Sequence, residues 1–432
     1  MRFLFVHQNF PGQFLHLLRH LVAMGGHEIV FITEPNANII DGVRKVPYAK
    51  PVPASAETHI AARELDAAVR RADAVTRTAH NLKALGFAPD IVIGHQGWGE
   101  MLNLPDVWPG VPVIGYMEYY YRTDGADVVF DPEFPIPEAD FPRVRAKNAI
   151  NHLALNLGGH GVTPTEWQLS TYPDWARARI DLLWEGVNLD VCSPDPKARR
   201  AALKFGAMTI RRTDKLVTYV SRDLEPYRGV HPMMRALPAL MRARKDLKVV
   251  MVGGEGQSYG SPPPAGGSWR ERFLTEVRGE IDPDRVVFPG RIPYGDYLAL
   301  LRRSDAHVYL TYPFVASWSL REALSIGCAV VGSDTQPVRE FVTHGKNGLL
   351  TSFFDPKALA ETVLEVMENK ALDARIRTGA RRYAEKRLAM ADYLQAFTRQ
   401  IEAVTGATLV PSKGARVKPV RTKSALPASA RL

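Results

Sequence analysis

The chain has 432 residues, of which 46% are hydrophobic and 23% are charged, a composition typical of globular domains. Its length allows two or three domains, and no stretch approaches the ~18 apolar residues of a membrane-spanning helix. The formal net charge is +9, but six Lys and Arg residues and no acid lie after residue 406, so the remainder is nearly neutral. This distribution argues against a nucleic-acid-binding protein, whose basic charge would lie on its folded part.

Short apolar runs alternate with helical patterns along the first half, as in a parallel sheet covered by helices. Residues 2–7 are expected to form a strand rather than part of a signal peptide, because His7, Gln8 and Asn9 interrupt the apolar run. Residues 13–24 follow with apolar side chains at helical spacing, and Gly25 and Gly26 end that helix. Further strands are expected at residues 28–33, 91–94, 111–117 and 180–184.

The second half repeats this alternation after a segment, residues 187–197, whose Pro, Asp and Asn content is typical of a linker. Strands are expected at residues 216–221, 247–253, 285–289, 306–311, 328–333 and 348–352, and a last helix at 383–403. The fold class is therefore α/β, with two Rossmann-like domains facing across a cleft. The expected domains are residues 1–190, residues 191–385, a C-terminal helix at 386–406 that returns to the first domain, and a disordered basic tail at 407–432.

The tail and the cysteines bear on the cellular setting. The basic tail contacts an anionic membrane surface or nucleic acid, or it is solvated without a partner. Cys192 and Cys328 are far apart and match no metal-ligand spacing, so neither a disulfide framework nor a zinc site is expected. This cysteine usage fits a reducing compartment, and we expect a cytoplasmic protein that is peripheral, if it contacts a membrane at all, at the inner face.

Three strand-to-helix loops carry candidate anion-binding residues. Gly12 precedes the first helix, where backbone N–H groups can approach an anion, although a plain turn is the alternative. Arg222 and Arg228 follow the strand at 216–221, and guanidinium groups bind phosphate oxygens in pairs. Solvated surface arginines are the alternative there. Gly254 lies in the turn after residues 247–253, and the Pro- and Gly-rich residues 258–268 form either a mobile loop or a plain surface loop.

The most informative segment follows the strand at residues 306–311. Ser317 is expected to cap a helix there, leaving the N–H groups of Trp318, Ser319 and Leu320 and the helix dipole for a phosphate. Glu322 lies one turn into this helix, where its carboxylate could accept two ribose hydroxyls. A solvent-facing helix glutamate is the alternative.

Two residues at expected strand ends in the first half are candidates for contact with a sugar. His95 follows the strand at 91–94, and Glu118 follows the strand at 111–117. A structural histidine is the alternative for the first. The tyrosines at positions 116, 119, 120 and 121 either present hydroxyls and ring faces to a sugar or belong to the core.

Together these segments resemble the family 4 glycosyltransferases of GT-B fold, from Met1 to about Ala403. Landmarks occur in the family's order: Gly-Gly-His-Glu at 25–28, Val-Thr-Pro-Thr-Glu-Trp at 162–167, Glu-Gly-Val-Asn-Leu-Asp at 185–190, Arg222, Arg228 with Gly229, the helix at 317–327, and Gly-Lys-Asn-Gly-Leu-Leu at 345–350. The ordered set is far more specific than any single piece.

The resemblance implies a retaining transferase that takes its donor from a nucleotide-diphosphate sugar and passes the sugar to a carbohydrate or lipid-linked acceptor. Donor binding falls to the second domain and acceptor binding to the first, with no metal and no nucleic-acid partner. Glu322 would hold the ribose, and Arg222 and Arg228 the diphosphate, joined by backbone N–H groups at Ser317–Leu320. The backbone near Arg291 would receive the base, and Gly12 and Gly254 would also approach the donor. Bacterial polysaccharide, glycolipid or glycoconjugate synthesis is the expected setting.

The sequence departs from the family pattern at three places. Phe314 stands where the first Glu of the E-x7-E motif is expected, and Arg228 stands for a lysine. Glu118 stands for a histidine, so the role of that loop is divided between His95 and Glu118. A nucleotide-sugar epimerase or phosphorylase of the same fold, or a catalytically inactive nucleotide-sugar-binding homologue, is the alternative function.

Overall fold

The computed structural model describes residues 1–411, which fold into two compact units. Unit 1 contains Met1–Glu185 and the described chain from Ala391 onward, and unit 2 contains Gly186–Met390. Most of the basic tail expected at 407–432 lies outside the described residues. Among residues 1–411, no helix is long and apolar enough to cross a membrane.

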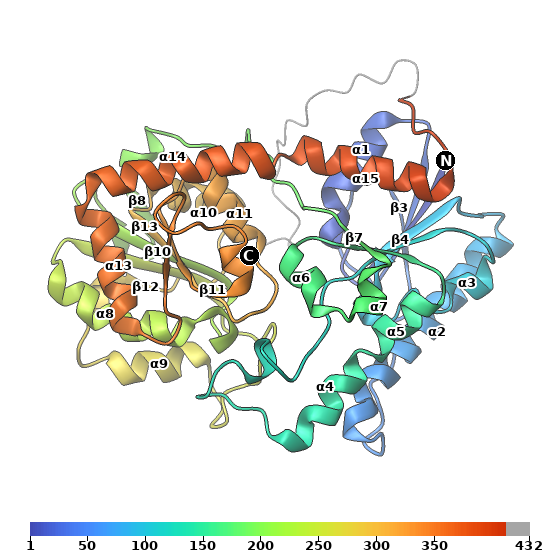
Figure 1. Cartoon of the computed structure of the whole chain (residues 1–432), viewed down its shortest axis with the longest axis horizontal. Helices are drawn as coiled ribbons and strands as arrows, with labels where there is room; N and C mark the ends of the chain where they lie inside the picture. The colour runs from blue at the N-terminus through green and yellow to red at the C-terminus, as the bar shows by residue number, and fades with distance from the viewer. Residues whose placement is uncertain (412–432) are drawn as a thin grey trace. The chain divides into compact units, whose positions relative to one another are not determined.

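Unit 1 is built on a parallel sheet of seven strands in the order β3-β2-β1-β4-β5-β6-β7. Strands β3, β4 and β7 are labelled in Figure 1. The strands are β1 Arg2–Val6, β2 Glu28–Thr33, β3 Arg44–Pro47, β4 Ile91–His95, β5 Val113–Tyr116, β6 His160–Thr163 and β7 Ile180–Leu182. The helices of this unit are α1 Leu15–Met24, α2 Arg63–Ala84, α3 Leu104–Val107, α4 Phe141–Lys147, α5 Ala149–Asn156, α6 Glu166–Thr171, α7 Asp174–Arg177 and α15 Met390–Thr405.

Helix α2 shows how the sequence pattern produces the core of unit 1. Its buried residues Val75, Ala79 and Leu82 recur at helical spacing, so they share one face. This face packs in one cluster with Leu4 and Val6 of β1 and Val30 and Ile32 of β2, all of them buried. Burial of each large aliphatic side chain contributes roughly 1.5–3 kcal/mol, which fixes β1 and β2 beneath the helix.

Unit 2 repeats the plan with six parallel strands in the order β12-β11-β10-β13-β14-β15. The strands are β10 Lys215–Asp223, β11 Leu247–Gly254, β12 Val286–Val287, β13 Ala306–Tyr309, β14 Val330–Ser333 and β15 Leu349–Thr351, and a separate antiparallel hairpin pairs β8 Leu203–Phe205 with β9 Met208–Ile210. The helices are α8 Val230–Ala243, α9 Trp269–Val277, α10 Tyr294–Arg303, α11 Trp318–Ile326, α12 Gln336–Arg339, α13 Pro356–Glu368 and α14 Lys370–Arg387.

Both sheets have the doubly wound strand order of Rossmann-like domains, which reverses direction beside the first strand. Ligands of such sheets bind outside the carboxyl ends of the strands at this reversal. It falls between β1 and β4 in unit 1 and between β10 and β13 in unit 2, so the residues just after these four strands define where a site should lie.

The structure corrects three expectations about secondary structure. Strands β3 and β6 and the β8–β9 hairpin were not expected. β3 is a half-exposed edge strand with two cations and a proline, and β6 contains a glycine, so neither shows a clear apolar pattern. The last helix expected at 383–403 is instead two helices. The Val187 N–H donates to the Leu388 carbonyl at 2.7 Å and the Met390 N–H donates to the Val187 carbonyl at 3.1 Å, which interrupts the helical ladder.

The third correction concerns the linker expected at residues 187–197. Its first part is packed into unit 2: Arg302 donates to the carbonyls of Val191 and Ser193, and Arg381 donates to those of Leu189 and Cys192. Arg302 and Arg381, both distant in the sequence, therefore hold in place a segment whose composition is typical of a linker.

Candidate functional site

In unit 2, Arg228 lies against the loop that joins β13 to α11. Its Nη1 donates to Thr311 Oγ1 at 2.8 Å and to the carbonyl of Val315 at 2.9 Å. The side chain is buried, with Arg228 only 4% exposed, so it is not one of the solvated surface arginines that were the alternative. Both bonds use Nη1, which leaves the Nε and Nη2 edge of the fork for an anion.

Gly229 brings Arg228 to this position. Its φ of 69° lies in the left-handed region, and a Cβ there would come within 2.5 Å of Leu310 Cβ. A side chain at Gly229 would therefore separate the start of α8 from the end of β13. The close approach of these two segments places the Arg228 guanidinium beside the loop that precedes α11.

The start of α11 differs in detail from the expectation. Ser317 occupies the N-cap position, but its hydroxyl makes no capping bond to the helix and instead contacts the hydroxyl of Ser319. The Ser317 N–H donates to the hydroxyl of Tyr309 at 2.7 Å. The Leu320 N–H donates to the Ser317 carbonyl at 3.2 Å, so it is not one of the N–H groups left for a phosphate. The start of the helix still lies at the positive end of its dipole. Ser319 and Leu320 are buried and Trp318 is 37% exposed, so the helix start is closely packed.

Gly254 and Arg291 lie against a carboxylate that sequence reasoning missed. Asp223, buried at the end of β10, accepts from Arg291 Nη2 at 2.8 Å. A Cβ on Gly254 would lie 2.3 Å from Asp223 Oδ1, so a glycine is needed where β11 passes this pair. Arg222 is exposed and makes no hydrogen bond or ion pair with any other described residue. Arg222 therefore lies near the end of β10, but its side chain does not bond to the Asp223–Arg291 pair.

The loop after Gly254 is anchored at its start by a second missed carboxylate. Glu225 Oε2 accepts the N–H groups of Ser258, Tyr259 and Gly260 at 3.4, 3.2 and 3.1 Å. Burial raises the pKa of Glu225, while these backbone N–H groups act in the opposite direction. The sequence left open whether residues 258–268 form a mobile loop or a plain surface loop. The structure fixes the start of this loop, because residues 258–260 bond to Glu225, the residue just before η7 (Pro226–Arg228).

This anchored loop carries Tyr259 over Arg228. The Arg228 guanidinium carbon lies 4.8 Å from the Tyr259 ring centroid, within the range of a cation–π contact. Phe314, at the position where the family pattern has a glutamate, is buried and packs edge-on against the rings of Tyr259 and Tyr227. An aromatic group therefore covers one side of the candidate diphosphate-binding cation.

Glu322 is held by two tyrosines of α10 rather than facing solvent. Its Oε1 accepts from Tyr294 at 2.6 Å, and its Oε2 accepts from Tyr297 at 2.8 Å. Burial raises the pKa of Glu322, and burial together with the Glu322 charge raises the pKa values of both tyrosine hydroxyls. The Cys192 thiol also donates to Oε1 at 3.9 Å, so Oε2 keeps one unused lone pair and two ribose hydroxyls would have to share oxygens that are already bonded. In the sequence, only the spacing of Tyr294 and Tyr297, one helical turn apart, could have indicated that these two side chains share a partner.

In unit 1, Gly12, His7 and His95 meet beside the reversal of strand order. A Cβ on Gly12, whose φ is 55°, would lie about 3.0 Å from the His7 ring. The His7 and His95 rings are perpendicular, with centroids 5.4 Å apart. Burial, and then the proximity of His95, lower the pKa of His7 well below its ordinary value. Sequence reasoning treated His7 only as the end of a strand, and the structure makes it the support for His95.

His95 and Glu118, between which the sequence left a role divided, are in direct contact. His95 Nδ1 accepts the N–H of Gly97 at 3.0 Å, so in a neutral imidazole Nε2 carries the proton and points it at Glu118 Oε2, 3.3 Å away. His95 is buried, whereas the Glu118 side chain is 36% exposed. The pair can therefore hold a proton at one defined atom and present a carboxylate beside it.

The tyrosines near Glu118 serve the fold. Tyr116 and Tyr119 are buried, and their hydroxyls donate to Glu185 at 3.0 Å and to Asp127 at 3.1 Å. Tyr120 stacks on His152 and bonds to its Nε2 at 2.8 Å. The core alternative therefore holds for these three side chains.

A further buried acid close to His95 was missed. Glu100 has no exposed surface and accepts from Tyr48 at 2.8 Å, while its Oε2 has no hydrogen-bond partner among the described residues. Burial raises the pKa of Glu100 to about 7. The Glu100 carboxyl, five residues after His95 in the sequence, is therefore expected to gain or lose its proton near neutral pH.

Two curated proteins illustrate the relatives of this chain. It is 24% identical over 266 residues to the D-inositol 3-phosphate glycosyltransferase of Thermobispora bispora, which covers 58% of each chain. It is 27% identical over 194 residues to the phosphatidyl-myo-inositol mannosyltransferase of Mycobacterium leprae, covering 44% of this chain and 45% of that one. The chain thus matches about half the length of these relatives.

Two solved structures share its fold. The sucrose-phosphate synthase of Thermosynechococcus elongatus matches with a TM-score of 0.69 at 16% identity, over 94% of this chain and 100% of that one. Anabaena HepE in complex with UDP-glucose matches with a TM-score of 0.66 at 15% identity, over 93% of this chain and 100% of that one. Identities this low show the fold alone, which is GT-B.

Two family models match consecutive parts of the chain. The model described as Glycosyl transferase family 4 group matches residues 25–192, which lie almost wholly in unit 1. The model described as Glycosyl transferases group 1 matches residues 204–383, which lie in unit 2. Together with the fold and the ordered landmarks, these matches establish that the chain belongs to the family 4 glycosyltransferases.

Proposed function

We propose that the protein transfers a sugar, with retention of configuration, from a nucleotide-diphosphate sugar bound by unit 2 to an acceptor hydroxyl bound by unit 1. The observation that carries this proposal is the state of Arg228. Among residues 1–411 no carboxylate lies within ion-pair distance of this buried guanidinium, on which Glu225 acts only from farther away, and its hydrogen bonds go to the neutral oxygens of Thr311 and Val315. A buried cation bonded only to neutral groups favours an anionic ligand.

The chemistry rests on charge stabilisation in unit 2. When the bond between the sugar and the diphosphate breaks, negative charge builds up on the leaving phosphate. The Nε and Nη2 edge of Arg228 and the first N–H groups of α11 would stabilise that charge, and such preorganised donors are worth several kcal/mol at a reacting centre. The leaving phosphate would then accept the acceptor proton on the same face of the sugar, so no protein nucleophile is required.

Other residues of unit 2 would bind the rest of the donor. Glu322 would bond the ribose through the lone pairs that Tyr294 and Tyr297 leave on its oxygens. The side chain of Arg222, exposed at the end of β10, would add a second cation for the diphosphate. Gly254 and Arg291, at the ends of β11 and β12, would flank the base and sugar, with Asp223 fixing the Arg291 guanidinium.

In unit 1 the proposal assigns the acceptor and part of the donor contact to His95, Glu118 and Gly12. The Glu118 carboxylate, held by the proton on His95 Nε2, would accept hydrogen bonds from sugar hydroxyls on its solvent-facing side. Two relatives are named for inositol 3-phosphate and phosphatidyl-myo-inositol. These names support a carbohydrate or lipid-linked polyol as acceptor, in bacterial polysaccharide, glycolipid or glycoconjugate synthesis.

We further propose that transfer needs no divalent metal, because Arg228 and α11 supply the positive charge that a metal would otherwise bring. Turnover measured in excess chelator tests this directly. Activity that persists supports the proposal, and activity that disappears and returns with added Mg²⁺ or Mn²⁺ contradicts it.

The donor is identified by a thermal-shift screen with UDP-, GDP-, ADP- and dTDP-sugars, because a bound donor raises the melting temperature by mass action. The stabilising donor is then incubated alone and with an acceptor panel, and the products are analysed. A glycosylated acceptor of retained configuration supports the proposal. Epimerised nucleotide sugar from donor alone, or tight donor binding without turnover on any acceptor, would instead favour the epimerase or the inactive homologue.

A further inference from the structure

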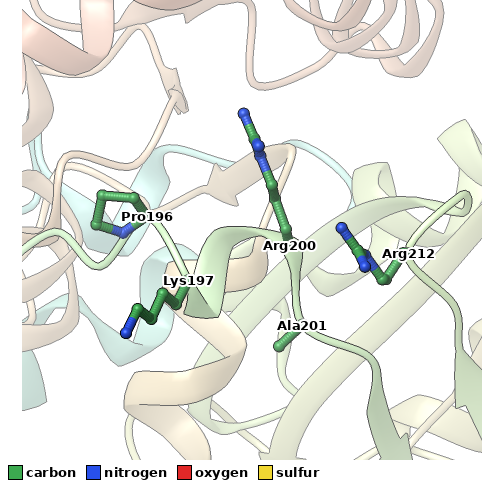
Figure 2. Close-up of a pocket in the computed structure, with 5 residues that line it drawn as sticks. All are labelled: Pro196, Lys197, Arg200, Ala201 and Arg212. Carbon is green, nitrogen blue, oxygen red and sulfur yellow. The ribbon is translucent and has the colours of Figure 1, made fainter.

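Unit 2 contains a basic pocket, far along the sheet from the residues discussed above. The pocket has a volume of about 590 Å³ and is lined by Pro196, Lys197, Arg200, Ala201 and Arg212 (Figure 2). Figure 2 shows the guanidinium groups of Arg200 and Arg212 extending to the same side of the chain, above Ala201. No acidic residue lines the pocket.

The segment that forms the pocket carries a local excess of positive charge. Between Asp195 and Asp214 there are six basic residues and no acid. Five of them are exposed and form no ion pair with any residue in the described part of the chain: Lys197, Arg200, Lys204, Arg211 and Arg212. The pocket therefore stands out against the otherwise nearly neutral folded chain.

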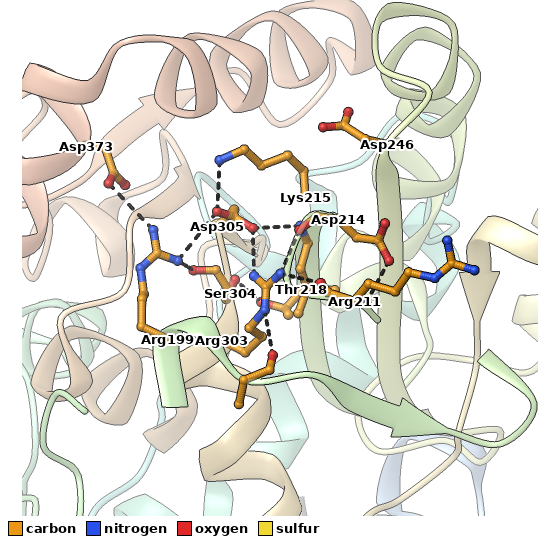
Figure 3. Close-up of polar contacts among 12 residues, drawn as sticks. Arg199, Arg211, Asp214, Lys215, Thr218, Asp246, Arg303, Ser304, Asp305 and Asp373 are labelled. Carbon is orange, nitrogen blue, oxygen red and sulfur yellow. Dashed lines mark hydrogen bonds and ion pairs between the residues drawn. The ribbon is translucent and has the colours of Figure 1, made fainter. Parts of the chain in front are cut away.

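Figure 3 shows the acids at the base of this segment. Asp305 bonds to Lys215 at 3.2 Å and to Arg303 at 3.0 Å, and lies 3.6 Å from Arg199. Arg199, the sixth basic residue, also lies 3.6 Å from Asp373. The two acids that flank the segment, Asp195 and Asp214, accept backbone N–H groups of Lys197, Ala198 and Arg211 and form no ion pair with the five exposed cations in the described part of the chain.

The pocket is separate from the candidate donor site. Lys215 and Asp305 mark the amino ends of β10 and β13, whereas Arg222 and the loop after Tyr309 lie at the carboxyl ends. β10 is nine residues long, which corresponds to roughly 27–30 Å of extended strand. A ligand in the pocket therefore cannot be the sugar diphosphate bound at the opposite edge of the sheet.

We propose that this pocket binds a phosphate-bearing ligand through Arg200 and Arg212. Two guanidinium groups on one side of a concave surface match the oxygens of phosphate groups, which accept bidentate bonds from arginine. Lys197, Lys204 and Arg211 add to the positive potential that attracts the ligand. The phosphate belongs either to a soluble polyphosphate or to the headgroups of an anionic lipid surface, and the two sources are distinguished by experiment.

The test compares the full-length protein with the double variant Arg200→Gln/Arg212→Gln. The matched control is Arg278→Gln/Arg382→Gln, which removes two charges from exposed arginines of the same unit that make no described ion pair. One arm titrates inorganic pyrophosphate by calorimetry. The other measures co-sedimentation with vesicles of phosphatidylglycerol and phosphatidylcholine, against vesicles of phosphatidylcholine alone. The residues of the candidate donor site are intact in both variants, so pyrophosphate bound there cancels in the comparison.

The proposal predicts that the pocket variant loses at least tenfold in affinity in one arm, while the control variant and the melting temperature change little. Loss in the pyrophosphate arm assigns the pocket to a soluble ligand, and loss in the vesicle arm assigns it to a lipid surface. Equal binding by the two variants in both arms, or no binding by the unaltered protein in either arm, overturns the proposal.

Discussion

The ring of Tyr259 lies over the guanidinium of Arg228, with the guanidinium carbon 4.8 Å from the ring centroid. The two residues come from different loops: Arg228 is fixed by Thr311 and Val315, and Tyr259 by the N–H bond from its backbone to Glu225. Tyr259 is 38% exposed. A diphosphate that binds Arg228 must therefore share this cation with an aromatic ring.

Replacing Tyr259 with alanine is predicted to tighten donor binding. Arg228 keeps its two bonds to the β13–α11 loop, and the cation–π contact that competes with the phosphate, worth about 0.5–2 kcal/mol, is removed. We expect a gain of a few-fold in affinity, measured by calorimetry with the donor found in the thermal-shift screen. Tyr259→Phe keeps the ring and should change the affinity less. Weaker binding by Tyr259→Ala would show that the ring supports the ligand instead.

Replacing Glu322 with glutamine is predicted to weaken donor binding while the fold stays intact. The amide can accept from one tyrosine but must donate to the other, so some stability is lost in addition, about 0.5–1.5 kcal/mol. Tyr297→Phe removes one of the same hydrogen bonds without altering the carboxylate, and serves as the control. If both variants lower donor affinity equally, or neither does, Glu322 has a structural role and the ribose assignment is wrong.

Replacing His95 with alanine is predicted to lower kcat at least tenfold, because His95 is the proton-bearing partner of Glu118 in unit 1. Glu118→Gln keeps an oxygen that can accept a hydrogen bond from His95 Nε2, so this variant should lower kcat less than His95→Ala does. Steady-state kinetics with saturating donor separates the effects on kcat and on acceptor KM. A larger loss for Glu118→Gln than for His95→Ala would reverse the two roles.

Glu100 predicts a pH dependence of stability with a definite sign. Burial raises its pKa from the ordinary 4.5 to about 7 in the folded protein, so the folded state binds more protons than the unfolded state between these values. The cost of burying the ionised carboxyl is therefore absent below pH 4.5 and grows as the pH rises through 7.

Glu100→Gln removes this cost, and chemical denaturation should show it. Relative to the unaltered protein, the free energy of unfolding of the variant should rise by up to about 3 kcal/mol between pH 4.5 and pH 8. Glu57→Gln, at an exposed position, removes the same charge and should show no such rise. A pH-independent difference between Glu100→Gln and the unaltered protein would contradict the account.

Much of the fold follows from sequence patterns that depend on local chemistry. The buried runs that became β1, β2, β10 and β11 are nearly continuous apolar stretches, as parallel strands covered on both faces must be. Because the carboxyl ends of parallel strands share one edge, the sequence also indicated where Arg228, Ser317 and His95 would lie. Edge strand β3 escaped prediction because half of its surface faces solvent and its residues are polar.

The details of the site depend on contacts between distant segments, which leave weak sequence signals. Nothing near Glu322 in the sequence indicates that Tyr294 and Tyr297 take its oxygens, or that the Ser317 hydroxyl turns to Ser319 instead of capping α11. The break before α15 likewise depends on Val187, some two hundred residues earlier. The cluster of cations between Asp195 and Asp214, by contrast, is visible in the sequence, and the structure adds that Asp305 at its base is already paired with Arg303 and Lys215.

The most direct test of the proposed function is the affinity of Arg228→Ala for the donor, measured alongside its thermal stability. Arg242→Ala, which removes an exposed arginine of α8, is the control. The account predicts that Arg228→Ala binds the donor at least tenfold more weakly and loses turnover by a larger factor, with stability lowered by only about 1–3 kcal/mol from the two oxygens left unpaired. Donor affinity and turnover equal to those of the control variant would contradict it.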